Sequence, residues 1–539
     1  MQCVFFNFIL AESNLFDSAF SLYYLCLTAQ YKISDMSITR LLRPLFLRRV
    51  KASGRYGSDG DKLQQYQLHS LVSKAKFTEF GVNNRFKDIN SYYEYRDMVP
   101  LHYYENLKPY VMRMVNGERN VLWPGGIKNY AQSSGTSDGK SKYIPISKES
   151  FKSCHYQGGF DAVAHYLNLN PDSKIFDGKS FILGGSFANE LGKHPGVCIG
   201  DLSANLIDNI NPLANMVRVP SKKIALMEDW EKKLPALVDA SRKKNITSIS
   251  GVPSWFLTVL KEIIKKEKAG SIHDIWPNLE VFFHGGISFA PYREQYMSIC
   301  DNDKMRYLET YNASEGFFAV QSSWDTNAML LLLDAGVFYE FIPLRELDKQ
   351  FPHALPLWEI SEGETYALVI SANNGLWRYI IGDTVTIESV SPVKIRIAGR
   401  TKHYINAFGE ELMVHNADSA LAKACKECNV SVLNYTAAPV YAGDNSHGHH
   451  QWLIEFVKKP DDINIFADTL DKYLQKENSD YEAKRYKGIF LDRLSVIDAK
   501  KGLFDIWLRT TGKLGGQRKI PRLSNNRNIM DKMLELNNL

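Results

Sequence analysis

The chain has 539 residues, of which 45% are hydrophobic and 23% charged, the composition of an ordinary soluble globular protein. A single hydrophobic core usually serves ~100–200 residues, so two or more domains are expected. The 65 basic and 60 acidic side chains leave a formal charge of only +5. That bias is too small to indicate nucleic acid as a partner, and no basic stripe with interleaved aromatic residues accompanies it.

The seven cysteines are few, odd in number and scattered: Cys3, Cys26, Cys154, Cys198, Cys300, Cys425 and Cys428. They indicate reduced thiols in a cytoplasmic protein, not a disulfide framework. Cys425 and Cys428 form a C-x-x-C pair in a helical-looking stretch, but no second pair completes a zinc site. Two incidental thiols on a helix are therefore the favoured interpretation.

Residues 1–35 form an uncertain N-terminal extension. Their apolar patches contain charged residues, no basic segment precedes them, and no apolar run reaches ~18 residues. A poor signal sequence and translation from Met36 are both open, and we favour the second. The segment MSITRLLRPLFLRRVK then begins a basic amphipathic helix, which we expect to close the first domain rather than lie on a membrane. No transmembrane span is predicted.

The hydrophobic pattern changes along the rest of the chain. Residues 36–125 look helical, with breaks at 54–60, Pro100 and Pro109. From about residue 126, short apolar runs alternate with amphipathic ones, which predicts an α/β fold with a largely parallel sheet. Between 325 and 400 the apolar period is two, which predicts antiparallel strands in a β-barrel-like part or a second sheet.

From Gly399 onward a β–α–β–α rhythm predicts a smaller α+β domain, with the residues GRTK at 399–402 as its linker. The predicted organisation is therefore a large domain over 36–398 and a small, mobile C-terminal domain over 399–539.

The first segment suited to nucleotide chemistry is YAQSSGTSDGKSKYIPIS, residues 130–147. It joins two apolar segments through a loop rich in glycine, hydroxyl groups and lysine, which suits phosphate binding by backbone amides and hydroxyls. It is not a Walker loop, because three residues instead of four separate Gly135 from the Gly139–Lys140–Ser141 run. A solvated polar turn is the alternative.

Two further segments each place a carboxylate beside an apolar strand. In ETYNASEGFFA, residues 309–319, Glu315 lies in a bend of small residues. It could hold Mg²⁺ beside phosphates, or it could cap a helix. In GLWRYIIGDTV, residues 375–385, Asp383 follows Gly382 at the expected end of a strand. There it could accept hydrogen bonds from ribose hydroxyls, and an ordinary β-turn is the alternative.

In this order, the three segments resemble the nucleotide-binding motifs of the auxin-responsive acyl acid amido synthetase family, part of the firefly-luciferase-like adenylate-forming superfamily. The family's SSGTS-x-G, Tyr-x-x-Ser-Glu and Tyr-Arg-x-Gly-Asp-like motifs match 133–139, 311–315 and 379–383. Ile380 stands where the third motif has arginine. The resemblance covers nearly the whole chain after Met36 and includes GVPSWFLTVLKEI, FFHGG, GHHQWLIEF and GGQRKIPRL.

The resemblance implies a role for each matching residue. ATP would be bound by Ser133, Ser134, Gly135, Thr136, Ser137, Gly139, Tyr311, Ser314 and Asp383. Within this set, Tyr311 would lie against the adenine and Asp383 would bind the ribose. Glu315 would hold Mg²⁺, and Lys519 would neutralise the charge that develops between the attacking carboxylate and the α-phosphate. One more solvated cation is the alternative for Lys519.

His447, His449 and His450 form a cluster that could bind zinc. The resemblance argues against a metal there, because a similar Gly-His pair precedes a strand in the family without one. Aromatic residues between the first two motifs could line an acyl pocket, although core positions are more typical of each of them: Phe151, Tyr156, Trp255 and Phe283.

The implied activity uses ATP and Mg²⁺ to activate a carboxylic acid as acyl-AMP, and then transfers the acyl group to an amine, with an amino acid expected. A thiol acceptor such as coenzyme A is one alternative. A non-catalytic, nucleotide-binding member of the family is another. The expected partners are thus small molecules, and the protein is expected to be a cytoplasmic monomer.

Overall fold

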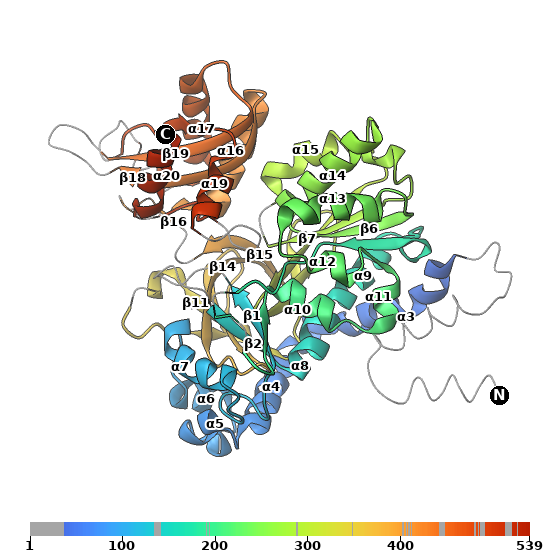
Figure 1. Ribbon diagram of the computed structural model, residues 1–539. Coiled ribbons are helices and arrows are strands. Elements are labelled where there is room, and N and C mark those ends of the chain that lie inside the picture. Colours follow the sequence, from blue (N-terminus) through green and yellow to red (C-terminus); the bar gives the residue numbers. More distant parts are fainter. Residues whose placement is uncertain are drawn as a thin grey trace.

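A computed structural model describes residues 37–133, 142–189, 191–192, 194–286, 289–347, 349–400, 404–405, 407, 410, 412–440, 448–478, 481–482, 485, 491–511, 520–524 and 526–538. In Figure 1 the chain forms a large lobe and a smaller C-terminal lobe. The hydrophobic clusters of the large lobe contain only residues up to Ile397, and those of the small lobe begin at Ile405. No helix in the described part of the chain is long and apolar enough to cross a membrane.

The first helices pack on the outside of the large lobe: α3 (Ile38–Ser53), α4 (Tyr56–Ala75), α5 (Glu79–Asn83), α6 (Tyr92–Met98) and α7 (Tyr104–Val115). The apolar face of α3 is buried against α9 (Gln157–Leu169), where Phe46 stacks on Phe160 with ring centroids 4.2 Å apart. The amphipathic helix therefore closes the large lobe, as expected, and does not present that face to a membrane.

One of the expected helix breaks is wrong, because Pro109 lies inside α7. The break expected over 54–60 is confirmed only at its start: α3 ends at Ser53 and α4 begins at Tyr56, so Gly57 and Gly60 lie inside a helix. A Cβ atom at Gly60 would lie 3.2 Å from Leu333, so this glycine permits close packing of the helix on the sheet. Tertiary burial thus outweighs the low helix propensity of glycine and proline. The break before Pro100 is confirmed, because α6 ends at Met98.

The residues after 175 form the predicted parallel part of the sheet, in the order β5-β3-β6-β7-β8. These strands are β3 (Lys179–Ile182), β5 (Arg218–Val219), β6 (Ile246–Gly251), β7 (Val281–Gly285) and β8 (Arg306–Ala313). The connecting helices are α10 (Leu202–Asp208), α11 (Pro212–Met216), α12 (Lys222–Ala225), α13 (Trp230–Ser241), α14 (Pro253–Glu267) and α15 (Arg293–Met297). Because parallel strands end at one edge, the segments that follow β6, β7 and β8 meet there.

The predicted antiparallel strands continue this sheet and do not form a second one. They are β9 (Gly316–Gln321), β10 (Met329–Leu331), β11 (Val337–Pro343), β12 (Leu355–Pro356), β13 (Thr365–Ala372), β14 (Tyr379–Val390) and β15 (Val393–Arg400). The twelve strands follow the order β12-β11-β13-β14-β15-β10-β9-β8-β7-β6-β3-β5. The α/β class is therefore as predicted, but the barrel-like part is an open region of one sheet among the described residues.

A smaller sheet, in the order β2-β1-β4, carries the first motif. Its strands are β1 (Asn129–Ser133), β2 (Lys142–Ile146) and β4 (Cys198–Gly200). After β2 the chain forms α8 (Lys148–Ser150), a π-helical turn over Phe151–Tyr156 and then α9. Figure 1 places β1 and β2 beside the antiparallel end of the large sheet.

The small lobe is a three-stranded sheet, β18-β19-β20, with helices on both faces. Its elements are β16 (Tyr404–Ile405), β17 (Leu412–Met413), α16 (Val414–Glu427), β18 (Ser431–Val440), β19 (His449–Lys458), α17 (Ile463–Glu477), β20 (Ser495–Asp498), α19 (Leu503–Thr510) and α20 (Asn528–Asn538). Trp452 packs in the cluster with α16 and α17, whereas Leu453 packs in the cluster with α19 and α20. Alternation along β19 thus gives this lobe two cores.

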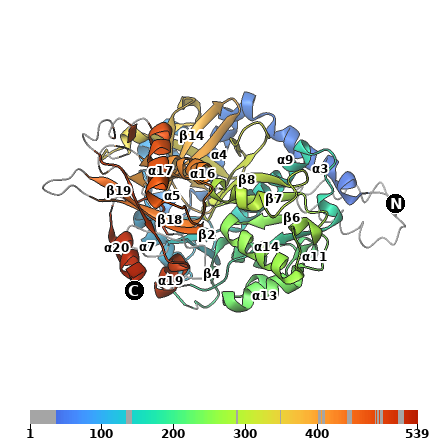
Figure 2. The ribbon, with the colours of Figure 1, turned by 90° about the horizontal axis from the view of Figure 1, so that it is seen from above.

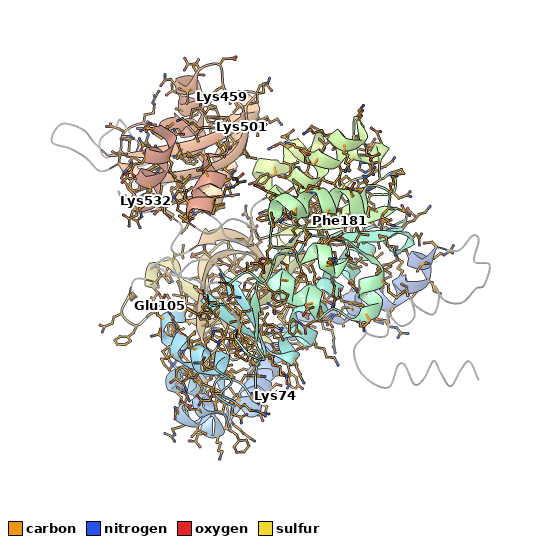
Figure 3. All side chains as sticks on the ribbon, viewed as in Figure 1. Lys74, Glu105, Phe181, Lys459, Lys501 and Lys532 are labelled. Atoms are coloured by element: carbon orange, nitrogen blue, oxygen red, sulfur yellow. The ribbon has the colours of Figure 1, made fainter. Side chains whose placement is uncertain are left out.

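The expected linker begins inside a strand, because Gly399 and Arg400 belong to β15. Its last two residues, 401–402, lie outside the described residues, so the boundary at 398 remains a prediction. Seen from above in Figure 2, α16 lies over the region of β14 and β8. In Figure 3 the side chain of Phe181 lies in the interior of the large lobe, whereas Lys459, Lys501 and Lys532 lie on the outside of the small lobe.

Candidate active site

The first motif spans the turn of a β-hairpin. Its described ends are Ser133 at the end of β1 and Lys142 at the start of β2, and these two residues are paired in the hairpin. The residues between them lie outside the described part of the chain, including the predicted nucleotide-binding residues Ser134, Gly135, Thr136, Ser137 and Gly139. The hairpin therefore fixes both ends of the predicted phosphate loop.

The second motif lies where β8 turns into β9. Tyr311 is in β8, and Ser314 and Glu315 form the turn, as predicted. The pairing between β8 and β9 is shifted between Tyr311 and Asn312, which marks a bulge. Such bulges re-aim side chains at sheet edges and next to active sites. Glu315 is only 5% exposed, and its backbone carbonyl accepts a hydrogen bond of 3.1 Å from the side-chain amide of Asn374.

The third motif lies in β14, and Asp383 is not at the strand's end, as the sequence suggested, because β14 continues to Val390. On β13, Ala367 pairs with Thr384 and Val369 with Ile380, so three residues of β14 face the single residue Leu368. This bulge contains Gly382, whose φ of 95° is readily adopted only by glycine. The strand is thus distorted at the position where Asp383 has to be re-aimed.

The structure brings the second and third motifs into direct contact. The phenol of Tyr311 donates a hydrogen bond of 2.6 Å to Oδ2 of Asp383. Both side chains are buried, with exposed fractions of 4% and 7%. Three strands, β15, β10 and β9, lie between β14 and β8 in the sheet. The contact therefore requires a strongly curved sheet, and its two residues are 72 positions apart in the sequence.

The first motif is tied to the third by a lysine. The ammonium of Lys142 donates a hydrogen bond of 3.1 Å to the hydroxyl of Tyr379, the first residue of β14. It also lies 5.9 Å and 5.6 Å from the ring centroids of Tyr104 and Tyr379. The sequence analysis did not predict the contact between Lys142 and Tyr379. Lys142 could have been chosen as a candidate, because it is the second lysine of the glycine-rich segment.

A buried ion pair positions the start of β14. Arg378 has a φ of 40°, in the left-handed region that non-glycine residues seldom occupy. Its guanidinium pairs with Glu340 at 2.8 Å, where Tyr92 also donates a hydrogen bond to the same carboxylate. Arg378 further donates to the carbonyl of Val99 at 2.7 Å. These contacts hold the turn that leads into Tyr379.

The departure of this chain from the family motif at Ile380 is accommodated by the core. Ile380 is 2% exposed and belongs to an apolar cluster with Ile342, Ala354, Ala367 and Val369. An arginine there would place a charge among apolar side chains. In this chain the position therefore contributes to the packing of an apolar cluster.

Two titratable side chains lie opposite each other just before the second motif: His284 at the end of β7 and Glu309 in β8. Burial lowers the pKa of His284 to about 3, and loss of solvent raises the pKa of Glu309 to about 7. The imidazole is therefore neutral at physiological pH. The Glu309 carboxyl is partly protonated there, because its burial is not compensated by a cation among the described residues.

The histidine cluster does not come together around one point in the described residues. His450 is completely buried and lies 2.8 Å from the carboxylate of Glu410 through Nε2. His449 is the neighbouring residue on β19, and His447 lies outside the described part. No group of three or more metal-binding side chains was found among the described residues.

Lys519 also lies outside the described residues, so its distance from the nucleotide motifs is not defined. The chain is described again from Ile520, beside β18. The predicted pocket residues are split: Phe151 stacks on Tyr156 with centroids 5.9 Å apart, while Trp255 packs edge-on against Trp230.

Three domain models of one family match the chain: the GH3 family N-terminal domain over 55–305, its central domain over 330–400 and its C-terminal domain over 415–528. Among curated proteins, the chain is 23% identical to jasmonoyl–L-amino acid synthetase JAR4 of Nicotiana attenuata over 61% of the chain and 67% of that protein. It is 22% identical to indole-3-acetic acid-amido synthetase GH3.3 of Arabidopsis thaliana over 86% of the chain and 89% of that protein.

Solved structures share the fold. The acyl acid amido synthetase AtGH3.15 in complex with 2,4-DB superimposes with a TM-score of 0.74 at 16% identity, over 92% of this chain and 96% of that one. A 2-hydroxyisobutyryl-CoA ligase in complex with 2-HIB-AMP matches with a TM-score of 0.50 at 12% identity, over 93% and 92%.

The fold, a large α/β lobe with a smaller C-terminal lobe, is that of the adenylate-forming enzymes. Within that class, the three matching domains cover most of the sequence. The chain belongs to the GH3 family, which confirms the resemblance seen in the motifs.

Proposed function

We propose that this chain is an acyl acid amido synthetase: it activates a carboxylic acid with ATP and joins the acyl group to the amine of an amino acid. The observation that carries the proposal is the hydrogen bond between Tyr311 and Asp383. It joins the second and third predicted nucleotide motifs, which are distant in sequence, and the contact between Lys142 and Tyr379 ties the end of the first motif to the third. The relatives named as amino acid synthetases support the same reaction.

The nucleotide would be bound by all three motifs. Tyr311 would lie against the adenine, with its hydroxyl directed to Asp383, whose carboxylate would accept the ribose hydroxyls. Ser133, together with Ser134, Gly135, Thr136, Ser137 and Gly139 of the loop, would bind the phosphates, and Ser314 would do so from the second motif. A carboxylate already held by one phenol loses little entropy when it binds a ribose, which favours nucleotide affinity.

Mg²⁺ would be held by Glu315. Its carboxylate is a hard oxygen ligand in the turn between β8 and β9, next to the hydroxyl of Ser314. Mg²⁺ commonly takes one or two protein carboxylates and fills its other positions with phosphate oxygens and water. A single glutamate in a hydroxyl-bearing turn fits that pattern. When bound, the ion would neutralise phosphate charge.

The reaction would have two steps. A carboxylate oxygen of the acid attacks the α-phosphorus of ATP, and the bond to the leaving pyrophosphate breaks. The amino nitrogen of the acceptor, after losing a proton, then attacks the acyl carbon, and the bond to AMP breaks. Lys519 would place its ammonium where negative charge develops in the first step. Positioning and electrostatic stabilisation supply most of the catalysis in such displacements.

The test is acid-dependent exchange between ATP and labelled pyrophosphate with the purified full chain and a panel of carboxylic acids. We expect exchange with at least one acid, and amide product when amino acids are then added. Product that forms only with coenzyme A would establish the thiol alternative. Absence of exchange across the panel, together with ATP binding, would establish a non-catalytic nucleotide-binding protein.

Lys519→Ala tests the assignment of the catalytic cation. We expect this variant to lose exchange, while Cys428→Ala, a change of a thiol outside the proposed site, leaves exchange unchanged. Full activity of Lys519→Ala would refute the role assigned to this lysine.

A further inference from the structure

The carboxylate proposed to hold Mg²⁺ is carried by a two-residue turn. Ser314 and Glu315 lie between Ala313 and Gly316, the last pair of residues that β8 and β9 form. The backbone carbonyl of Glu315 accepts a hydrogen bond of 3.1 Å from the side-chain amide of Asn374, 59 positions further along the chain. Because a peptide group is planar, fixing this one restricts the backbone rotation that directs the side chain of Glu315.

Asn374 is completely buried and uses both ends of its side-chain amide. Its Oδ1 accepts a hydrogen bond of 3.2 Å from the amide of Leu376, while its Nδ2 donates to Glu315. The reversed orientation would place an NH₂ group against the N–H of Leu376 and an oxygen against the carbonyl of Glu315, so these partners determine the orientation. Asn374 thus connects the turn before β14 with the turn of the second motif.

The turn that carries Asn374 is closed by its own backbone. The amide of Ala372, the last residue of β13, donates to the carbonyl of Leu376 at 2.8 Å, and the amide of Gly375 donates to the carbonyl of Ala372 at 3.1 Å. Gly375 has a φ of 92°, and a Cβ atom there would lie 2.8 Å from Cβ of Leu122. Both the conformation and the space therefore require glycine, and the turn is a rigid support for a positioning side chain.

The same turn is anchored to the segment that follows the first motif. The hydroxyl of Ser147, directly after β2, donates a hydrogen bond of 2.6 Å to the carbonyl of Asn373. The side-chain amide of Asn373 donates at 2.9 Å to the hydroxyl of Ser153 in the π-helical turn. Since β14 begins at Tyr379, shortly after this turn, segments of all three predicted nucleotide motifs meet or end near it.

We propose that Asn374 is a positioning residue for Glu315: its side-chain amide holds the turn between β8 and β9 so that the carboxylate is presented to the Mg²⁺ bound with ATP. The inference rests on the proposed function. Mg²⁺ demands nearly ideal octahedral geometry, so a ligand that is turned away binds it less well. Loss of a group that orients a metal ligand typically lowers metal affinity or activity by about 10- to 100-fold. Asn374 itself does not need to touch the nucleotide or the ion.

The principal test is Asn374→Ser in acid-dependent pyrophosphate exchange. Serine can still accept a hydrogen bond from the amide of Leu376 and so preserve the turn, but it is too short to reach Glu315. We expect the concentration of free Mg²⁺ at half-maximal exchange to rise at least fivefold, with the KM for the acid changed less than twofold. A wild-type dependence on Mg²⁺ in this variant would refute the inference.

Asn416→Ser is the matched control. Asn416 of α16 is also buried, its Oδ1 accepts from the amide of Met413 at 3.1 Å, and its Nδ2 donates to the carbonyl of Glu477 at 2.8 Å. The variant removes the same kind of contact within the small lobe. It should lose a similar amount of thermal stability but keep the wild-type dependence on Mg²⁺. An equal shift in both variants would contradict a specific role of Asn374.

Hydrogen–deuterium exchange without nucleotide or metal provides a measurement that does not depend on activity. The amides of residues 314–318 should exchange several-fold faster in Asn374→Ser than in wild type, and at the wild-type rate in Asn416→Ser. Unchanged protection of these residues would overturn the anchoring argument. If wild type shows no pyrophosphate exchange with any acid, the proposed function fails and the role toward Mg²⁺ fails with it. Faster hydrogen exchange in Asn374→Ser would still establish that Asn374 fixes the turn.

Discussion

Tyr311 and Asp383 form a site in which a buried carboxylate is held by one phenol. The hydrogen bond of 2.6 Å fixes the orientation of the carboxyl group. If the ribose is bound there, the two residues have unequal roles. Asp383 would contact the nucleotide through charge, whereas the hydroxyl of Tyr311 would act mainly by holding Asp383.

We therefore expect Asp383→Ala to raise the KM for ATP in pyrophosphate exchange by tenfold or more, since hydrogen bonds to charged groups contribute about 1.5–3 kcal/mol. Tyr311→Phe should raise it less, by about three- to tenfold. Tyr93→Phe is the control, because Tyr93 makes the same type of contact, at 3.1 Å to Glu359, on the exposed surface. Equal effects of the Tyr311 and Tyr93 variants would contradict the assigned roles.

The burial of Glu309 makes the free energy of unfolding depend on pH. Its folded-state pKa of about 7 lies above the ordinary value of 4.5 because burial disfavours its charge. Between these two values the unfolded chain ionises this carboxyl while the folded chain keeps it protonated. The free energy of unfolding therefore falls as pH rises from 4.5 to 7, by up to about 3 kcal/mol for this group, and the loss levels off above pH 7.

Glu309→Gln should remove that fall. Urea unfolding at pH 5, 6, 7 and 8 should show the variant gaining stability relative to wild type as pH increases. Buried histidines such as His155 and His284 have lowered pKa values, which change the free energy of unfolding with pH in the opposite direction. Their contribution is the same in both proteins and cancels when the variant is compared with wild type. Glu362→Gln, on the surface, should track wild type at every pH. If the free energy of unfolding changes with pH in the same way in Glu309→Gln and in wild type, the raised pKa of Glu309 is disproved.

At the scale of elements, helix α9 packs against β9 directly beside the second motif. This close approach depends on Gly158, because a Cβ atom there would lie 2.2 Å from Cγ of Phe317. Phe317 follows Glu315 by two residues, and its amide also contacts the sulfur of Cys154 at 3.2 Å. The position of the turn that carries Glu315 is thus coupled to the packing of α9.

Gly158→Ala should lower the free energy of unfolding by about 1–3 kcal/mol or more, the usual cost of overpacking a core. Gly159→Ala is a matched control one residue along the same helix, where an added Cβ meets nothing within 4 Å. That change should be neutral or stabilise by up to about 1 kcal/mol, since alanine favours helices over glycine. Chemical denaturation of both variants measures the difference, and equal stabilities would contradict the packing argument.

Element types were predictable where one period dominated. The alternation of apolar and amphipathic runs from about residue 126 predicted the parallel strands, and the period of two over 325–400 predicted the antiparallel ones. The errors arose where packing overrides local preference. Gly60 continues a helix because it packs closely against Leu333, and Asp383 lies within a strand because a bulge accommodates it. Neither partner is near in sequence, so no local pattern reveals them.

At the scale of the whole molecule, the proposed site uses residues from two strands of one curved sheet, β14 and β8, which three other strands separate, and from a hairpin outside that sheet. Ligand binding should therefore stabilise the large lobe as a unit. A ligand at a hundredfold excess over its Kd adds about 2.7 kcal/mol to the free energy of unfolding of the state that binds it.

We expect Mg²⁺ with ATP to raise the melting temperature of wild type by several degrees, and chelation of the metal by EDTA to remove most of that rise. Asp383→Ala should show a much smaller shift at the same nucleotide concentration. A scan of thermal unfolding measures each case. A wild-type shift that persists fully in EDTA would argue against Mg²⁺ at Glu315, and an undiminished shift in Asp383→Ala would argue against the nucleotide site.

The sequence by itself determined the class of fold, because this class depends on short periods along the chain. It also carries the family resemblance from which Ser133, Glu315 and Asp383 are predicted to bind the nucleotide and Mg²⁺, because each motif consists of residues that are neighbours in the sequence. Only the tertiary structure decided that the antiparallel strands continue one open sheet, and that Tyr311 reaches Asp383 across three strands. Curvature, bulges and ion pairs between distant segments depend on side chains that are far apart in sequence, so a local sequence pattern cannot predict them.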